Sequence, residues 1–349
     1  VRDPDPEVLL GFLAEMEFRT VTKRIADKLG VEAPEVVVAA PVADVAAPEA
    51  VDFAPDTYEC VRDVAALQVW VNRIRERGYV AVDTETTGLN DMTAELVGIS
   101  LCVEAGQACY IPLTHKASAS DDLFGSDDVA EGQMDIGECL ALLKPVLEDP
   151  AIIKIGQNMK YDAKIFARLD VAVDPIDDTM LMSYAMNAGL HNHGMDTLSQ
   201  EYLGHTPIPI KPLLGSGKSA ITFDRVPIDE AVKYAAEDAD ITLRLWQKFK
   251  PLLHVNRVTT VYETMERPLV PVLAQMERNG IKVDRDTLSR MSNAFAQKMA
   301  GLEAEIQEMA GRPFNVGSPK QLGEILFDEM GLPGGKKGKT GAYATGADI

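Results

Sequence analysis

Short apolar segments of strand length alternate with helical segments between about residues 58 and 254. Strands are predicted over residues 79–82, 96–103, 108–111 and 151–155. Helices are predicted over about 136–148, after Asp162, and over 228–245. The first three strands follow one another closely, which favours antiparallel pairing, and later elements alternate between strand and helix. The expected fold is therefore an α/β domain with a mixed sheet.

The residues before this region differ from it in composition. Residues 1–30 contain a predicted helix over 6–29. Residues 31–57 contain no Lys or Arg and carry recurring prolines among Ala, Val and acidic residues. That composition is typical of an extended linker.

The residues after this region contain no further strand pattern. Helices are predicted around 269–276, over 285–309, and from Ser318, where Ser is the N-cap and Pro319 occupies the first helical position. Residues 255–349 are therefore expected to begin a helical domain that the chain does not complete. We expect the chain to be a piece of a longer protein.

Charge and cysteine content narrow the functional classes. The formal net charge of −20 argues against a protein that coats nucleic acid by bulk attraction, yet it is compatible with an enzyme whose acids gather at a metal site. The four cysteines have neither CxxC nor zinc spacing, which indicates free thiols in a reducing, cytoplasmic compartment. No apolar stretch approaches the roughly 20 residues of a membrane span, so no membrane association is expected.

Acidic side chains occur where three of the predicted elements begin or end. Asp83 and Glu85 follow the strand at 79–82, and their i, i+2 spacing points both to one face. Asp162 lies where a strand gives way to a helix. Tyr234 and Asp238 lie one turn apart on one face of the 228–245 helix. The sequence therefore offers four acids and a phenol from three separate elements.

Each signal also has a purely structural interpretation. Asp83 and Glu85 could be ordinary polar residues at a strand end, and Asp162 could favour the N-terminal end of a helix dipole. Asp238 could belong to an acidic helix surface, since Glu237 and Asp240 flank it. Three small residues on that helix, Ala231, Ala235 and Ala239, favour close approach to a sheet instead.

The four acids together suit one chemistry. Hydrolysis of a phosphodiester needs a nucleophile made near neutral pH and positive charge on the leaving oxygen, and two divalent ions about 3.5–4 Å apart provide both. Mostly acidic ligands favour Mg²⁺ or Mn²⁺. The pattern thus predicts a two-metal phosphodiester hydrolase.

Three stretches resemble the exonuclease motifs of the DEDD superfamily, in the tyrosine subclass. They are Val82–Leu89, Gly156–Asp162 and Tyr234–Asp240. The resemblance is closest to the 3'-5' proofreading domain of bacterial family A DNA polymerases, the DNA polymerase I family. Phe314–Leu322 and Lys339–Asp348 resemble the start of that family's thumb, and residues 1–30 are similar to the tail of its 5' nuclease region.

The resemblance implies a ribonuclease H-like fold and a role for each motif residue. Asp83 would bridge two metal ions, Glu85 and Asp238 would complete the first site, and Asp162 would hold the second. Zn²⁺ in place of Mg²⁺ or Mn²⁺ is possible at one site. Tyr234 would orient the attacking water with Glu85. Substrate contacts are expected at Leu89, against the terminal base, and at Thr86 and Asn158.

The implied organisation is an exonuclease domain over residues 58–254 followed by a truncated thumb over 255–349. The implied activity is removal of 3'-terminal nucleotides from single-stranded or frayed DNA, with DNA as the partner and a monomeric state. Polymerase catalytic residues are not expected in this chain. Two alternatives stay open: a catalytically silent DNA-binding module, and an RNase D-like RNA exonuclease.

Overall fold

The computed structural model describes residues 5–15, 18–32, 52–117, 129–217, 220–338 and 341–346. Most of the linker predicted over 31–57 and part of the predicted thumb motif at 339–348 lie outside these residues. The chain divides into two compact units, Val1–Asn279 and Gly280–Ile349, and each is considered by itself.

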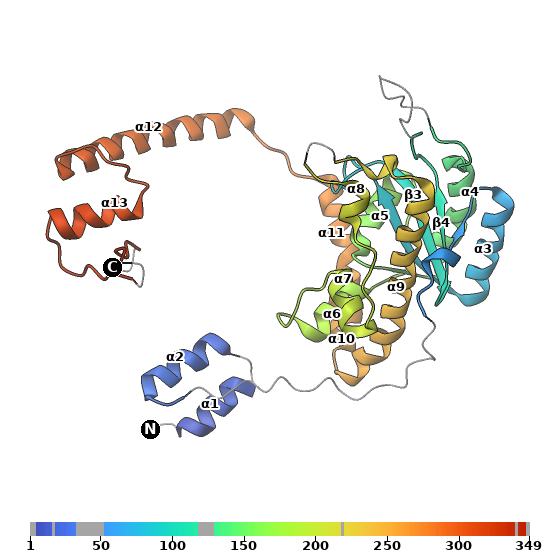
Figure 1. The fold of residues 1–349 in the computed structure, drawn as a ribbon, viewed down its shortest axis with the longest axis horizontal. Helices are drawn as coiled ribbons and strands as arrows, with labels where there is room; N and C mark the ends of the chain where they lie inside the picture. Colours follow the sequence, from blue (N-terminus) through green and yellow to red (C-terminus); the bar gives the residue numbers. More distant parts are fainter. Residues whose placement is uncertain are drawn as a thin grey trace. The chain divides into compact units, whose positions relative to one another are not determined.

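A six-stranded mixed sheet forms the centre of the first unit, in the order β1-β4-β3-β2-β5-β6 (Figure 1). β2 is antiparallel to β3 and parallel to β5, and β3 is antiparallel to β4. The strands are Glu59–Cys60 (β1), Tyr79–Thr86 (β2), Leu96–Glu104 (β3), Gln107–Pro112 (β4), Ile153–Gly156 (β5) and Ile176–Asp178 (β6). The predicted mixed sheet and its antiparallel β2-β3-β4 portion are confirmed. β1 and β6 are too short to show a periodic pattern in sequence.

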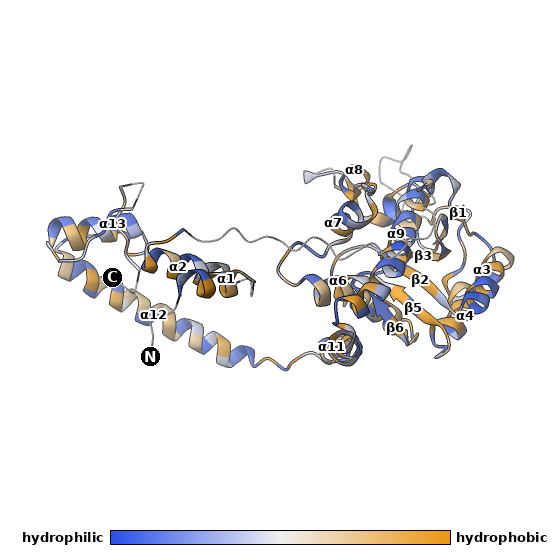
Figure 2. Ribbon diagram, turned by 90° about the horizontal axis from the view of Figure 1, so that it is seen from below, coloured by the Kyte–Doolittle hydropathy of each residue, from blue (hydrophilic) through white to orange (hydrophobic). Residues whose placement is uncertain are grey.

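Helices cover both faces of this sheet. The longer ones are α3 (Val64–Arg77), α4 (Ile136–Leu147), α5 (Met159–Arg168), α6 (Thr179–Asn187), α9 (Ile228–Val255) and α11 (Arg267–Asn279). Short helical segments are η1 (Pro55–Thr57), α7 (Met195–Leu198), η2 (Ser199–Leu203), α8 (Ile210–Leu214), η4 (Phe223–Arg225), α10 (Thr259–Val261) and η5 (Tyr262–Glu266). The labelled strands β2 and β5 are mostly apolar, whereas the helices around the sheet are of mixed hydropathy (Figure 2).

The alternation of side chains along β2 assigns each face to one set of helices. Val80 and Val82 join a buried cluster with residues of α3, α4 and α5, whereas Ala81 joins a second cluster on the α9 side. The alanine face of α9 packs there, and Ala231 and Ala235 are fully buried. Small side chains let the helix axis approach the sheet closely, as the sequence predicts.

β2 continues beyond the end of its parallel neighbour β5. The two strands pair from Tyr79 with Ile153 to Ala81 with Ile155, and β2 then runs on to Thr86. Asn158 follows β5 with a φ of 65° and begins α5, so the chain turns away from the sheet at this point. The far end of β2 therefore has one edge without a strand partner.

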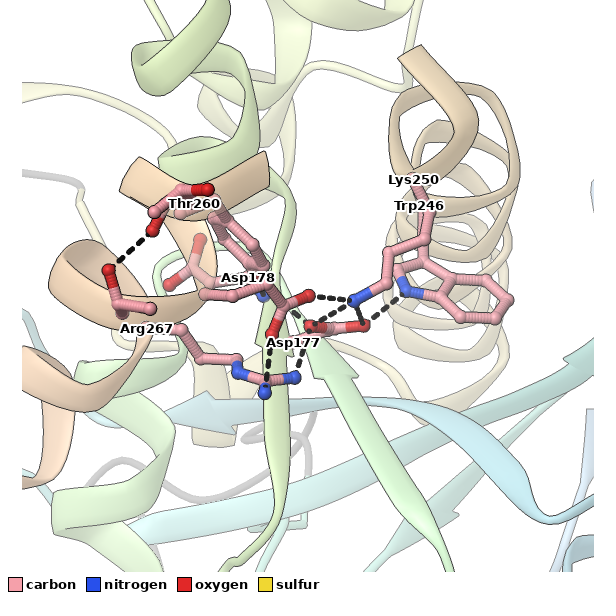
Figure 3. A network of polar contacts seen from close by, with 9 residues as sticks. Asp177, Asp178, Trp246, Lys250, Thr260 and Arg267 are labelled. Carbon is pink, nitrogen blue, oxygen red and sulfur yellow. Dashed lines mark hydrogen bonds and ion pairs between the residues drawn. The ribbon is translucent and has the colours of Figure 1, made fainter. Parts of the chain in front are cut away.

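A buried carboxylate connects β6 to three helical segments (Figure 3). Asp177 is fully buried and accepts hydrogen bonds from Trp246 Nε1 at 2.7 Å and Tyr262 Oη at 2.9 Å. Lys250 lies 2.9 Å and Arg267 3.3 Å from the same carboxylate. These contacts join α9, η5 and the start of α11 to the sheet. Residues 255–279, assigned to the thumb from sequence, thus pack within the first unit.

The N-terminal segment and the second unit contain helices and no strand in the part of the chain that the structure describes. The prediction of a single helix over residues 6–29 is wrong, because the segment forms two helices, α1 (Pro6–Glu15) and α2 (Arg19–Leu29). Phe18, which precedes α2, has a non-helical ψ of 58°. The second unit contains α12 (Arg285–Ala310), α13 (Pro319–Gly323) and η6 (Glu324–Glu329). Ser318 caps α13 as predicted. Among the residues described, none of the helices has the length and apolarity needed to cross a membrane.

Replacing Asp177 with Asn should lower the free energy of unfolding by about 2–4 kcal/mol, because two cations and two neutral donors lose a buried anion. The only tryptophans, Trp70 and Trp246, lie in the first unit, so urea unfolding followed by their fluorescence reports that unit. Glu263→Gln is the matched control. Glu263 pairs with the same Lys250 and Arg267 but is 27% exposed, so its loss should cost under about 1 kcal/mol. Equal costs for the two variants would contradict this assignment.

Candidate active site

Three carboxylates meet on the α9 side of β2. Asp83 and Glu85 share the face of Ala81, which packs toward α9, and Asp238 comes from α9 itself. One carboxylate oxygen from each residue lies within 4.8 Å of those from the other two. The i, i+2 spacing on the strand and the close approach of the alanine face of α9 together produce this cluster.

Asp162 reaches the same place from the other layer of the fold. It lies in the first turn of α5 and is 3% exposed. Its Oδ1 accepts hydrogen bonds from the backbone N–H of Thr84, at 3.0 Å, and from the Thr84 hydroxyl. The carbonyl of Gly78 accepts a hydrogen bond from the N–H of Ile153 in β5. Alternate residues of a strand turn their backbone groups to the same edge, so the N–H of Thr84, six residues later, also points to the β5 side. Asp162 therefore occupies the edge of β2 that β5 leaves unpaired.

Burial, and for three of them repulsion as well, raises the pKa of the four carboxylates. Burial raises the pKa of Asp83 to about 6. Burial, followed by the charges of Asp83, Asp238 and Asp162, raises the pKa of Glu85 well above its usual value. Burial and the Asp83 charge do the same for Asp162 and Asp238. In the part of the chain that the structure describes, no Lys or Arg pairs with any of the four. Such a site suits a bound cation, since positive charge would relieve both burial and repulsion.

Tyr234 lies beside this cluster, one turn before Asp238. The ring of Phe223 has its centroid 6.0 Å from that of Tyr234. Burial and the charges of Asp238, Glu85 and Asp83 raise the pKa of Tyr234 far above its usual value. The phenol therefore stays protonated and can donate a hydrogen bond at any physiological pH.

The acids that flank Asp238 have different surroundings. Glu237 is 1% exposed and accepts hydrogen bonds from His205 Nε2 at 2.9 Å and from the N–H of Ile208 at 2.6 Å. Asp240 is fully buried and bonds Tyr58, Gly106 and Arg244. The interpretation of this stretch as an acidic helix surface is therefore wrong. Both neighbours are satisfied by protein groups, whereas Asp238 faces other carboxylates.

The three residues expected to contact substrate lie at the end of β2, in the loop that follows it, and at the start of α5. Leu89 is 97% exposed in the loop after β2. The Thr86 hydroxyl donates to the carbonyl of Gly88 at 3.0 Å. Asn158 is exposed at the start of α5, and its N–H donates to Asp178 Oδ1 at 3.3 Å. Their contacts with a substrate stay a prediction.

Two supporting residues escape the sequence reasoning. Thr84 lies between two of the acids and points the opposite way, so nothing in its spacing links it to Asp162. Asp178 accepts from the N–H groups of Met159 at 2.9 Å and Leu181 at 3.1 Å, and so fixes the starts of α5 and α6. An Asp before Thr179 does suggest a helix cap in sequence, but not the second helix that it orients.

Comparison with known protein families agrees with this arrangement. Residues 58–254, which contain all four acids and Tyr234, match a family model described as 3'-5' exonuclease. The chain belongs to this 3'-5' exonuclease family. Residues 285–349 of the same chain match the model of DNA polymerase family A. The expected family and order of the two parts are thus confirmed, and an exonuclease domain of this kind implies the use of divalent metal.

Individual relatives of this exonuclease-containing chain are bacterial DNA polymerases I. The protein from Rhizobium leguminosarum is 50% identical over 84% of this chain and 29% of its own length. The protein from Pseudomonas aeruginosa is 38% identical over 98% of this chain and 36% of its own length. The chain therefore spans about a third of these curated relatives. The structure of the POL domain of Pol1 from M. smegmatis, 23% identical, has the same fold over 83% of this chain and 44% of that chain, with a TM-score of 0.65.

The crowded carboxylates should make metal-free stability depend on pH. A carboxyl whose folded pKa lies above its unfolded value binds more protons in the folded state, so stability rises as pH falls toward about 6. With chelator present, the free energy of unfolding should rise by about 1–3 kcal/mol between pH 8 and pH 6. The rise should be smaller for Asp83→Asn, whose side chain carries no charge at either pH.

Tryptophan fluorescence during urea unfolding measures this effect. Adding Mn²⁺ at pH 8 should stabilise the wild-type chain and should stabilise Asp83→Asn much less. The control is Asp229→Asn, on the same helix as Asp238, whose side chain is 92% exposed. If Asp83→Asn and Asp229→Asn changed the pH dependence equally, the carboxylate cluster would not be its source.

Proposed function

We propose that this chain removes nucleotides one at a time from the 3' end of single-stranded or frayed DNA and releases nucleoside 5'-monophosphates. The observation that carries the proposal is the cluster of Asp83, Glu85 and Asp238, joined by Asp162 from α5, without a cationic side chain among the four in the described residues. The family match over residues 58–254 supports it. DNA polymerases I among the relatives support DNA as the substrate.

The acids divide into two sets by their positions. Asp83, Glu85 and Asp238 would hold one divalent ion, and Asp162, from the opposite layer, would hold a second that shares Asp83. When bound, such ions activate water near neutral pH and neutralise charge on the leaving oxygen. All the ligand atoms are carboxylate oxygens, which favours Mg²⁺ or Mn²⁺ over Zn²⁺.

The remaining site residues would act on the water and on the strand. Tyr234, kept protonated beside Asp238, and Glu85 would hold the attacking water in line with the terminal phosphodiester. Thr86 and Asn158 would contact the terminal nucleotide, and the exposed side chain of Leu89 would pack against its base. Single-stranded ends are then preferred because a paired terminal base must first unstack. A monomeric chain and a cytoplasmic location stay predictions.

Asp238→Asn should lower the rate of shortening of a 5'-labelled single-stranded DNA by about a thousandfold or more, because a charged ligand is lost where charge develops. Tyr234→Phe should lower it by about tenfold to a hundredfold, because only the hydroxyl is lost. Rates are measured on gels with Mg²⁺ or Mn²⁺. Asp229→Asn, the exposed acid on the same helix, should act like the wild-type chain.

The alternatives give different results in this assay. Binding of DNA in Ca²⁺ without cleavage in Mg²⁺ or Mn²⁺ by the wild-type chain would indicate a silent DNA-binding module. Faster shortening of an RNA of the same sequence would indicate an RNA exonuclease. Unchanged activity of Asp238→Asn would place the chemistry elsewhere.

A further inference from the structure

The loop between β2 and β3 exposes a large apolar side chain on an ordered backbone. Asn90 orders the loop, because its carbonyl accepts from the N–H groups of Thr93 at 2.9 Å and Ala94 at 2.7 Å, and its side chain accepts from Met92 at 3.1 Å. Ala94 is buried in the cluster beneath the loop. Leu89, at the tip, is nevertheless 97% exposed. The exposure of Leu89 thus comes from a defined conformation.

One face of α5 holds this loop at three positions. Tyr161 donates to the carbonyl of Gly88 at 2.6 Å. Lys164 forms an ion pair with Asp91. Arg168 donates to the carbonyls of Asp91, at 3.0 Å, and of Ala94. The spacing of Tyr161, Lys164 and Arg168 is i, i+3, i+7, which is a single stripe along the helix.

Lys164 is an unusual member of this stripe. Its side chain is only 5% exposed, and its ammonium pairs with Asp91 in the loop and with Glu277 of α11. Burying an ammonium costs free energy that is recovered only with well-placed anions. Two carboxylates meet that need here, so the loop, α5 and α11 share one buried charge.

The same helix carries Asp162, next to Tyr161 in sequence. α5 therefore sets the distance between a carboxylate of the candidate metal site and the loop that bears Leu89. Opening a terminal base pair costs a few kcal/mol. The side chain of Leu89 can help to separate the terminal base pair only if the loop backbone keeps its position when the side chain is pushed against the base.

We propose that Lys164 and Arg168 are positioning residues that hold the Leu89 loop rigid against α5, and so decide how well paired 3' ends are used relative to single-stranded ends. The inference rests on the proposed exonuclease function, and it concerns strand selectivity rather than the chemical step. Neither side chain forms a hydrogen bond or ion pair with Asp83, Glu85, Asp162 or Asp238 among the described residues.

Lys164→Met removes the charge and keeps much of the side-chain length. Its rate on a single-stranded DNA should stay within about twofold of wild type, while its rate on a blunt duplex with the same 3' sequence should fall about fivefold to tenfold. Asp91→Asn breaks the same ion pair from the loop side, where the carboxylate is 20% exposed, and should act alike. Glu277→Gln is the matched control: it removes the other carboxylate that pairs with Lys164, so the ratio of the two rates should not change.

A double mutant separates this role from a general loss of stability. If Lys164 acts through the loop tip, Lys164→Met should have no further effect on the ratio in a Leu89→Ala background. Equal losses on both DNAs, an unchanged ratio in Lys164→Met and Asp91→Asn, or multiplied effects in the double mutant would each overturn the inference. If the wild-type chain shortens neither DNA, the proposed function fails instead.

Discussion

The site depends on one pair of hydrogen bonds, from Thr84 to the carboxylate of Asp162. They form because β2 outruns β5, which leaves the Thr84 N–H facing an open edge. A strand partner there would satisfy the backbone but would bring no charge. The carboxylate of Asp162, from α5, accepts that hydrogen bond instead. It also brings a fourth acid to the end of β2, where Asp83 and Glu85 point toward α9. The site therefore requires β5 to end before Thr84, because a longer β5 would pair with the N–H that Asp162 accepts from.

Function and stability oppose each other at this edge. Burial raises the pKa of all four carboxylates, repulsion raises the pKa of Glu85, Asp162 and Asp238 further, and no cationic side chain pairs with them in the described part of the chain. Asp178, at the end of β6, accepts hydrogen bonds at the starts of α5 and α6. Asp177, in the same strand, connects β6 to α9, η5 and α11 through Trp246, Tyr262, Lys250 and Arg267. Two adjacent aspartates in β6 therefore support the elements that carry the repelling acids. This division of roles is typical of sites that are built for a ligand that is itself charged.

Sequence reasoning reaches the elements and the acids, and it stops at the contacts between them. The strands at β2, β3, β4 and β5 carry enough apolar residues to be predicted, whereas β1 and β6 do not. Asp83 and Glu85 share a face as their spacing implies, and Asp238 joins them as the family resemblance implies. The contacts of Thr84 with Asp162, of Asp178 with α5 and of Lys164 with Asp91 could not be predicted, because each joins residues that are distant in sequence. The packing of α11 within the first unit could not be predicted for a different reason, since its buried residues are only Val270 and Ala274.

The alanine face of α9 has a consequence for how the helix is oriented. The alanine methyl groups allow α9 to approach the sheet closely. They do not interdigitate deeply with the strands, so they alone would not fix the rotation or the axial position of the helix. Glu237 and Asp240, on either side of Asp238, remove that freedom, because each is buried and bonded to groups on different segments. Turning the helix by one residue would strand both carboxylates away from their donors. The hydrogen bonds of Glu237 and Asp240 therefore fix the rotation of α9 about its axis, and in this orientation the side chain of Asp238 points toward β2.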